Sequence, residues 1–267
     1  MKFDFALLLT ALSAFTGLVW LVDALFFAKS RNLMVKEGEE VTEPALVDYS
    51  RSLFPVLFFV LALRSFVAEP FRIPSSSMMP SLLIGDFILV IKYAYGLRLP
   101  ITNKKFLAIG EPKRGDVVVF RPPHHPDQDW IKRIVGLPGD TIAYRDNIVY
   151  VNGVALRYRT LGQYVGKGQG VEATGSDLLE EALPGRPHPV LEHEDYPFGM
   201  QGDGEWKVPP GQYFVMGDNR DNSEDSRFWA VHFLPEENLR GKAFLIWLNW
   251  DSDAGGVDFS RIGSKIP

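Results

Sequence analysis

The chain of 267 residues contains no cysteine, so it has no disulfide, no thiol nucleophile and no cysteine-based metal site. Its net charge of −5 leaves no basic excess, and the composition therefore gives no indication of nucleic-acid binding. The length allows two small domains, or one domain preceded by membrane anchors.

Histidine is scarce and poorly placed for catalysis. None of the five histidines belongs to a motif with a serine, and no Gly-x-Ser-x-Gly elbow is present. His124 and His125 lie near Asp127 and Asp129, but their spacing matches no standard zinc pattern and prolines flank the run. A polar loop is the better interpretation. A serine nucleophile in this chain would need a base other than histidine.

The apolar residues are concentrated before residue 70. Residues 5–28 are interrupted by one charge, Asp23, and a helix of this length spans about 36 Å, enough to cross a hydrocarbon core of about 30 Å. A cleavable signal peptide is the alternative. The apolar stretch is too long for one, only Lys2 precedes it, and no Ala-x-Ala site follows.

A second apolar segment covers residues 53–68 and is short for a membrane span. Pro55 falls in its first turn, where proline is tolerated, and Arg64 can reach the interface from its far end. A buried or interfacial helix is the alternative. The loop between the segments carries four Lys or Arg and the residues before Phe5 carry one, so the positive-inside rule places the loop in the cytoplasm and residues 70–267 outside.

From Phe87 onward the sequence consists of short β-type runs separated by glycine, proline and asparagine turns. No long amphipathic helical pattern occurs after residue 80. We therefore expect a mainly antiparallel β domain. Residues 155–208 are rich in glycine, proline and charge with little periodicity, which is typical of an inserted subdomain or long loops.

Ser77 is the candidate nucleophile. It lies in the stretch FRIPSSSMMP at residues 71–80, where the chain leaves the second apolar segment. Serines beside proline are most often turns. The apolar pair Met78 and Met79 nevertheless suits a substrate groove, and a serine becomes nucleophilic once a base lies beside it.

Lys132 is the candidate base. It lies in the apolar run WIKRIVGLPGD at residues 130–140. Because a strand alternates sides, Trp130, Lys132 and Ile134 share one face, and burial of the two apolar residues would bury the lysine. Burial lowers the pKa of an amine, and a neutral lysine can accept a proton. An exposed strand lysine is the alternative.

A polar run at residues 217–227 directly follows the strand-like YFVM. It is either a solvated turn or a hydrogen-bonded corner. In the second case the Ser223 hydroxyl would orient the lysine amine, and Asp218, Asp225 and Arg227 would form supporting ion pairs.

Together these segments resemble the bacterial type I signal peptidases, also called leader peptidases, in order and approximate spacing. The matching stretches are FRIPSSSMMPSLLIGDFILV, KRGDVVVF, WIKRIVGLPGD and PPGQYFVMGDNRDNSEDSRFW. With the two apolar segments, the resemblance covers nearly the whole chain except residues 155–208 and is closest to the Gram-negative, two-anchor form.

The resemblance implies a role for each matching residue. Ser77 would be the nucleophile, Lys132 the general base, and the Ser75 hydroxyl and the Ser77 N–H the oxyanion hole. Ser223 would position the lysine amine, and the polar corner would contain Asp218, Asp225, Arg227 and Arg133, with Arg133 paired to Asp218. Pockets for the small side chains one and three residues before the cut would be lined by Phe71, Ile73, Met78, Leu82, Ile88, Val119, Trp130 and Ile131.

The chain departs from the family pattern in three places. Ser76 stands where relatives often have glycine. Trp130 stands where many have tyrosine, and its larger ring could narrow the pocket. The insertion also lacks the cysteine pair that is often found there. The resemblance further implies an antiparallel β-sheet catalytic domain of the signal peptidase and repressor-protease type, preceded by two transmembrane helices.

The implied function is removal of signal peptides from exported preproteins after Ala-x-Ala by a Ser/Lys dyad without a cofactor or metal. The partners would be preproteins, membrane phospholipid and the export machinery, with no nucleic acid. The enzyme would lie in a bacterial inner membrane. Residues 1–28 would form a first transmembrane helix with a short periplasmic N-terminus, 29–52 a cytoplasmic loop and 53–69 a second transmembrane helix. The periplasmic β core would comprise 70–154 and 209–267, with the insertion at 155–208.

Two alternatives follow from the same residues. A self-cleaving Ser/Lys protease of the repressor type resembles the same β fold, but membrane anchors and the lack of a DNA-binding module argue against it. A non-catalytic, membrane-tethered β module that assists exported proteins would make Ser77 and Lys132 incidental.

Overall fold

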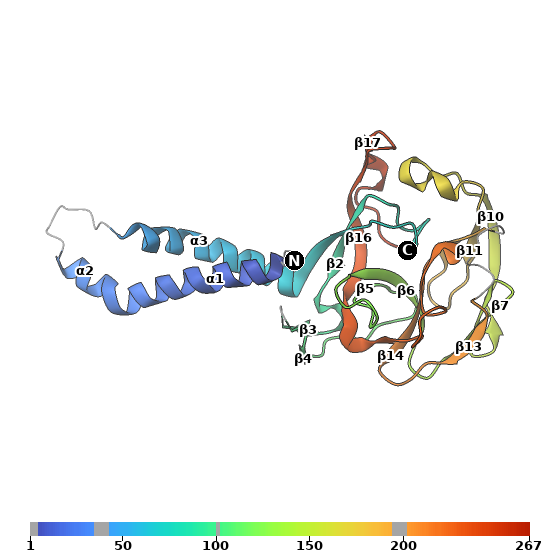
Figure 1. Ribbon diagram of the computed structural model, residues 1–267, viewed down its shortest axis with the longest axis horizontal. Helices are drawn as coiled ribbons and strands as arrows, with labels where there is room; N and C mark the ends of the chain where they lie inside the picture. The colour runs from blue at the N-terminus through green and yellow to red at the C-terminus, as the bar shows by residue number, and fades with distance from the viewer. Residues whose placement is uncertain (1–4, 35–42, 100–101, 194–201) are drawn as a thin grey trace. The chain divides into compact units, whose positions relative to one another are not determined.

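The computed structural model describes residues 5–34, 43–99, 102–193 and 202–267. The chain forms two compact units, one of residues 1–67 with 99–102 and one of residues 68–98 with 103–267. The first unit is helical, and the second consists mainly of β-strands (Figure 1).

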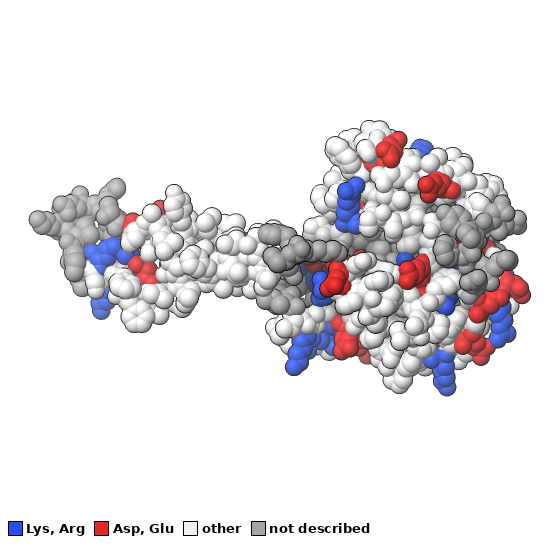
Figure 2. All heavy atoms as spheres, in the orientation of Figure 1, with Lys and Arg blue, Asp and Glu red and all other residues white. Residues whose placement is uncertain are grey.

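The helical unit contains two segments that are long and apolar enough to cross a membrane, Phe5–Arg31 and Ala45–Val67. The first comprises α1 (Phe5–Val22), a π-helical turn and α2 (Ala28–Met34); the second comprises α3 (Ala45–Ala62) and a π-helical turn. Figure 2 shows a stretch of this unit with almost no charged side chain on the visible face. Asp23, in the π-helical turn after α1, accepts two hydrogen bonds from Arg31, of 2.7 and 2.8 Å.

The second apolar helix begins eight residues before the position predicted from the sequence, at Ala45 instead of residue 53. Pro44 precedes its first turn and Asp48 lies within that turn, where a carboxylate interacts favourably with the helix dipole. Residues 45–52, which include Asp48 and Arg51, are therefore helical. Gly17 of α1 allows a close approach to α3, because a Cβ atom there would lie 2.6 Å from the Phe54 ring.

The β unit is organised around one large antiparallel sheet, which confirms the predicted fold class. Its strands follow the order β1-β2-β16-β5-β6-β14-β15, with β17 paired to β16. Their bounds are β1 Ala68–Arg72, β2 Asp86–Ile91, β5 Val117–Phe120, β6 Trp130–Gly136, β14 Gln212–Met216, β15 Leu234–Pro235, β16 Leu239–Asp251 and β17 Gly256–Val257.

Side-chain alternation on β5 and β6 divides the core of this sheet into two faces. Ile131 pairs with Val119 and belongs to one apolar cluster with Met78 and Leu82. Ile134 belongs to the other cluster, with Val118, Phe120 and Trp229, and Trp130 packs against it. Lys132 pairs with Val118 and so faces the second cluster.

Three smaller sheets lie in the described part of this unit. They are β13-β7-β8-β9, β10-β11-β12 and β3-β4. The bounds are β3 Leu97–Arg98, β4 Lys105–Leu107, β7 Thr141–Arg145, β8 Ile148–Val151, β9 Val154–Ala155, β10 Tyr158–Gln163, β11 Asp177–Glu181, β12 His188–Glu192 and β13 Gly204–Lys207.

The segment 155–208, in its described part, contains the three-stranded sheet β10-β11-β12 and the strand β13, which pairs with β7. The segment belongs to the same compact unit as the rest of the β domain. A backbone hydrogen bond from Leu191 N–H to the Asp218 carbonyl, 2.9 Å long, joins it to the polar corner at residues 217–227.

Candidate active site

Ser77 lies in the connection between β1 and β2. The base of this connection is closed by backbone hydrogen bonds from Ile73 N–H to the Asp86 carbonyl, 2.8 Å, and from Gly85 N–H to the Ile73 carbonyl, 2.9 Å. Met78 and Met79 are fully buried, and Met78 belongs to the apolar cluster on one face of the sheet. Ser77 itself is only 9% exposed, so its hydroxyl is at the edge of the core instead of in a solvated turn.

The structure brings Lys132 of β6 to Ser77. The Lys132 Nζ donates a hydrogen bond to Ser77 Oγ, with a distance of 2.6 Å. The Ser75 Oγ lies 3.4 Å from Ser77 Oγ. Two serines of one loop and a lysine 55 residues later therefore converge on one point.

The lysine is in a water-poor environment. Lys132 pairs with Val118 of the neighbouring strand β5. The centre of the partly buried Trp130 ring lies 5.8 Å from Lys132 Nζ. Burial lowers the pKa of Lys132 from 10.5 to about 8, although the carboxylates of Asp225, Glu224 and Asp218 oppose the shift. An amine with this pKa is partly neutral at physiological pH and can act as a base.

Two buried ion pairs form the corner behind the lysine. Arg133 donates hydrogen bonds of 2.8 and 2.7 Å to the two oxygens of Asp218. Arg227 binds Asp225 in the same bidentate way, at 2.9 Å for both bonds. The Arg133 guanidinium also donates to the Gly115 carbonyl at 2.9 Å, so the first pair is tied to the turn that precedes β5.

Ser223 lies at this corner and donates a hydrogen bond of 2.9 Å to Asp225 Oδ2. Asp225 is therefore the described partner of this hydroxyl, and the role of Ser223 in orienting the lysine amine stays a prediction. Gly217 brings Ser223 and the nucleophile loop together. A Cβ atom at Gly217 would lie 2.2 Å from Ser223 Oγ and 2.4 Å from the Ser77 carbonyl oxygen.

Comparison with known proteins identifies the family to which the chain belongs. The family described as "Signal peptidase, peptidase S26" matches residues 46–250. The chain is 42% identical to signal peptidase I of Pseudomonas fluorescens over 98% of this chain and 99% of the relative. It is 32% identical to signal peptidase I of Haemophilus influenzae over 98% of this chain and 92% of the relative. This chain belongs to the signal peptidase family.

A crystal structure of signal peptidase I from Enterococcus faecalis V583 is 28% identical and covers 51% of this chain and 98% of that chain, with a TM-score of 0.32. Membership of the signal peptidase family makes the chain a peptidase and implies preprotein substrates. The two long apolar helices agree with a membrane-bound signal peptidase of the two-anchor form.

Most residues predicted to line the substrate pockets of this signal peptidase lie in one apolar cluster. Phe71 packs against it, and its members include Ile73, Met78, Leu82, Ile88, Val119 and Ile131. Trp130 is the exception, because it packs against the cluster on the opposite face of the sheet. Its ring lies 5.4 Å from the His124 ring and 5.8 Å from the His125 ring.

The two neighbouring histidines do not gather with Asp127 and Asp129. They lie near Glu224, and the atoms of the three side chains that could bind a metal ion all lie within 4.8 Å of one another. All three side chains are exposed. His124 Nε2 lies 3.5 Å from Glu224 Oε1, so the loop at 122–129 is joined to the polar corner from the solvent side.

Sequence reasoning missed two groups of residues at this site. The first is Asn219 and Asn222, which lie within the matching stretch but were given no role. The second is a buried pair between Glu181 of β11 and Arg220, 2.6 Å apart. His188 Nε2 lies 3.5 Å from Glu181 and 3.7 Å from Asp218. Burial, assisted by Arg133, lowers the pKa of His188 to about 4 and keeps the ring neutral at pH 7.

Proposed function

We propose that this chain is a membrane-anchored serine endopeptidase that removes signal peptides after Ala-x-Ala, with Ser77 as nucleophile and Lys132 as general base. One observation carries the proposal: the 2.6 Å separation of Lys132 Nζ and Ser77 Oγ at a lysine that is only 4% exposed. The short separation permits direct proton transfer, and the burial supplies the neutral amine.

The reaction begins when neutral Lys132 accepts the Ser77 hydroxyl proton and Ser77 Oγ attacks the scissile carbonyl carbon. The oxyanion accepts hydrogen bonds from the Ser77 N–H and the Ser75 hydroxyl. The Lys132 ammonium then protonates the leaving amine, which becomes the N-terminus of the mature protein. Finally Lys132 takes a proton from a water molecule as its oxygen attacks the ester carbonyl carbon. The Lys132 ammonium then returns this proton to Ser77 Oγ as the ester bond breaks and the signal peptide leaves with a new C-terminal carboxyl group.

The preference for small residues is supported by the packing of the apolar cluster. Leu82 and Ile88 are fully buried and Ile73 is 2% exposed, so the side chains predicted to line the pockets already pack tightly against one another. Such a cluster offers a shallow apolar floor instead of a deep cavity. An alanine methyl fits on this floor, whereas a larger side chain would have to displace packed groups.

The decisive experiment compares cleavage of a preprotein with an Ala-x-Ala site, in liposomes, by the parent chain and by Ser77→Ala, Lys132→Ala and Lys132→Arg. The exposed lysine of β13 provides the matched control Lys207→Ala. We expect cleavage after the second alanine by the parent and the control alone, because arginine cannot be deprotonated. Cleavage by Ser77→Ala or by Lys132→Arg would refute the dyad.

We propose that the β unit lies on the outer, periplasmic face and the loop between the helices in the cytoplasm, as the positive-inside rule predicts. The cysteine-free chain makes this directly testable. Asp253→Cys in the β unit should react with a membrane-impermeant maleimide added outside spheroplasts, and Pro44→Cys, at the exposed residue before α3, should react only after lysis. The reverse pattern would invert the topology.

A further inference from the structure

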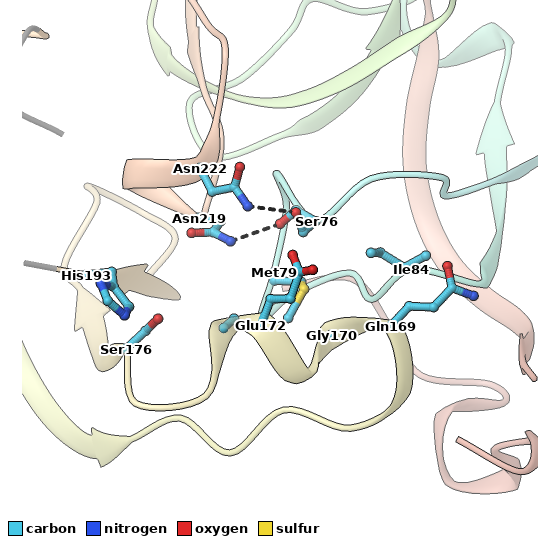
Figure 3. A pocket seen from close by; sticks show the side chains of 11 residues that line it. Ser76, Met79, Ile84, Gln169, Gly170, Glu172, Ser176, His193, Asn219 and Asn222 are labelled. Atoms are coloured by element: carbon cyan, nitrogen blue, oxygen red, sulfur yellow. Dashed lines mark hydrogen bonds between the residues drawn. The ribbon is translucent and has the colours of Figure 1, made fainter. Parts of the chain in front are cut away.

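The described hydrogen bonds of Asn219 and Asn222 converge on the peptide that carries the nucleophile. Asn219 Nδ2 donates to the Ser76 carbonyl at 3.2 Å, and Asn219 N–H donates to the Ser77 carbonyl at 3.1 Å. Asn222 Nδ2 donates to Ser76 Oγ at 2.9 Å. Figure 3 shows both amide groups pointing to Ser76 across one end of a pocket.

The Ser76 carbonyl and the Ser77 N–H belong to the same peptide group. In a trans peptide these two groups lie in one plane and point in opposite directions. A donor that holds the Ser76 carbonyl therefore also sets the direction of the Ser77 N–H. That N–H is one of the two proposed donors to the oxyanion, and its direction decides how well it meets the developing charge.

A second bond to the same carbonyl makes this constraint strong. Met79 N–H also donates to the Ser76 carbonyl, at 3.0 Å, which closes the turn at 76–79. Both lone pairs of the oxygen are then engaged. Hydrogen bonds that a carbonyl accepts polarise the peptide group, so they also make its N–H a better donor.

The segment that supplies these donors is itself fixed. Asp218, next to Asn219, is bound by Arg133 in a bidentate pair, and the Asp218 carbonyl accepts from Leu191 N–H at 2.9 Å. Asn219 is 5% exposed. The side chain that donates to the Ser76 carbonyl is thus buried and belongs to a segment that is held on two sides.

We propose that Asn219 is a positioning residue that orients and polarises the Ser76–Ser77 peptide so that the Ser77 N–H is aimed at the oxyanion. Asn222 assists through the Ser76 hydroxyl, at the position where relatives of the chain often have glycine. The inference rests on the proposed function, because it assigns a task to the oxyanion hole of the same dyad.

The test uses the full-length protein in detergent with Asn219→Ala and Asn219→Asp. The second variant keeps the shape of the side chain but replaces the amide donor with an acceptor. Asn238→Ala is the matched control, because Asn238 Nδ2 also donates to a backbone carbonyl, that of Arg121 at 2.7 Å, outside the nucleophile loop. Rates are measured at pH 9, where Lys132 of the parent chain is largely neutral, and the pH profile of each variant shows whether its midpoint has moved.

Loss of one hydrogen bond of this kind predicts a fall in kcat of about tenfold for Asn219→Ala, with KM unchanged. Asn219→Asp should fall further, and Asn238→Ala should keep the parent kcat. In a Ser76→Ala background Asn222→Ala should have no added effect, because its acceptor is gone.

A pair of ligands separates an oxyanion effect from a loosened fold. A peptide aldehyde ending in Ala-x-Ala adds to Ser77 Oγ and places its oxygen in the oxyanion hole, whereas the matching peptide alcohol binds without forming an oxyanion. We expect Asn219→Ala to weaken aldehyde binding about tenfold and to leave alcohol binding unchanged. Equal weakening of both ligands, or no change in either, would overturn the positioning role.

The outcomes also keep this inference apart from the proposed function. An active Ser77→Ala would remove the dyad itself. An inactive Ser77→Ala together with unchanged aldehyde binding by a folded Asn219→Ala would retain the dyad and refute only the role of Asn219. Thermal unfolding of each variant, compared with the parent, shows that the fold is intact.

Discussion

The lowered pKa of Lys132 predicts a specific pH dependence of cleavage. Burial brings this pKa to about 8, because the desolvated ammonium form is disfavoured. Only the neutral amine accepts the Ser77 proton, so kcat/KM should follow the neutral fraction of Lys132 in the free enzyme. Activity should therefore rise with pH and reach a plateau above the pKa.

The size of the rise distinguishes a buried base from an ordinary one. With a pKa of about 8, the neutral fraction is about 1% at pH 6, about 10% at pH 7 and about 50% at pH 8. We expect kcat/KM to increase about fiftyfold between pH 6 and pH 8, and only about twofold above pH 8. A lysine with an ordinary pKa would give an increase close to tenfold for each unit up to about pH 9.

A charge substitution tests the same reasoning from another side. The Glu224 carboxylate raises the pKa of Lys132, so Glu224→Gln should move the midpoint of the profile to lower pH and increase the rate at pH 7. The displacement should shrink at high salt, because the Glu224 side chain is 60% exposed. Glu237→Gln, an exposed acid elsewhere in the β unit, should leave the midpoint unchanged.

The assay is the initial rate of cleavage of a peptide with an Ala-x-Ala site, below KM, from pH 6 to pH 10. Samples returned to pH 8 after each incubation control for irreversible inactivation. A profile that keeps rising steeply through pH 9.5 would show that the base is not a desolvated lysine. A flat profile would show that no titrating base limits the reaction.

Three further predictions concern single residues. Ser75→Ala should lower kcat about a hundredfold with little change in KM, measured by steady-state cleavage, because one oxyanion donor is lost; an unchanged kcat would remove Ser75 from the oxyanion hole. Gly217→Ala should abolish cleavage while the fold is retained, since its Cβ would meet Ser223 Oγ at 2.2 Å; parent-like activity would contradict this packing. Glu181→Ala should destabilise the protein by about 3 to 5 kcal/mol in denaturant titration, because it leaves Arg220 buried and unpaired; a loss below about 1 kcal/mol would show that water reaches this pair.

The burial of Lys132 could be predicted because its signal is local, whereas the pairing with Ser77, 55 residues away, rested on the need for a base and on the family resemblance. An apolar strand with a lysine at an alternating position predicts a buried amine, and Ile134, fully buried on the same face, agrees with it. The face of β6 on which each side chain lies was harder to use in predicting which residues line the substrate pockets. Trp130 shares the lysine side of β6, whereas Ile131 points to the other cluster. One strand cannot supply adjacent residues to the same apolar face.

The insertion could not be predicted because its polar residues are buried by pairing with distant partners. Glu181 and His188 look like solvated residues in the sequence, yet they are 0% and 1% exposed. The Glu181 carboxylate pairs with Arg220, which lies 39 positions later in the chain. Composition shows neither partner. The early start of α3 was missed for a related reason, since Asp48, Arg51 and Ser52 interrupt the apolar pattern but remain helical after Pro44.

The position of β16 has a consequence for synthesis of the enzyme. β1 and β2 frame Ser77, and β5 and β6 carry Lys132, but the two hairpins share no edge: β16 lies between β2 and β5. This strand is translated about 100 residues after Lys132. Within the large sheet, β16 therefore connects the strand that carries Lys132 to the strands that frame Ser77. We therefore expect a chain that ends before β16 to lack proteolytic activity, although it contains both residues, because its sheet cannot form in this order.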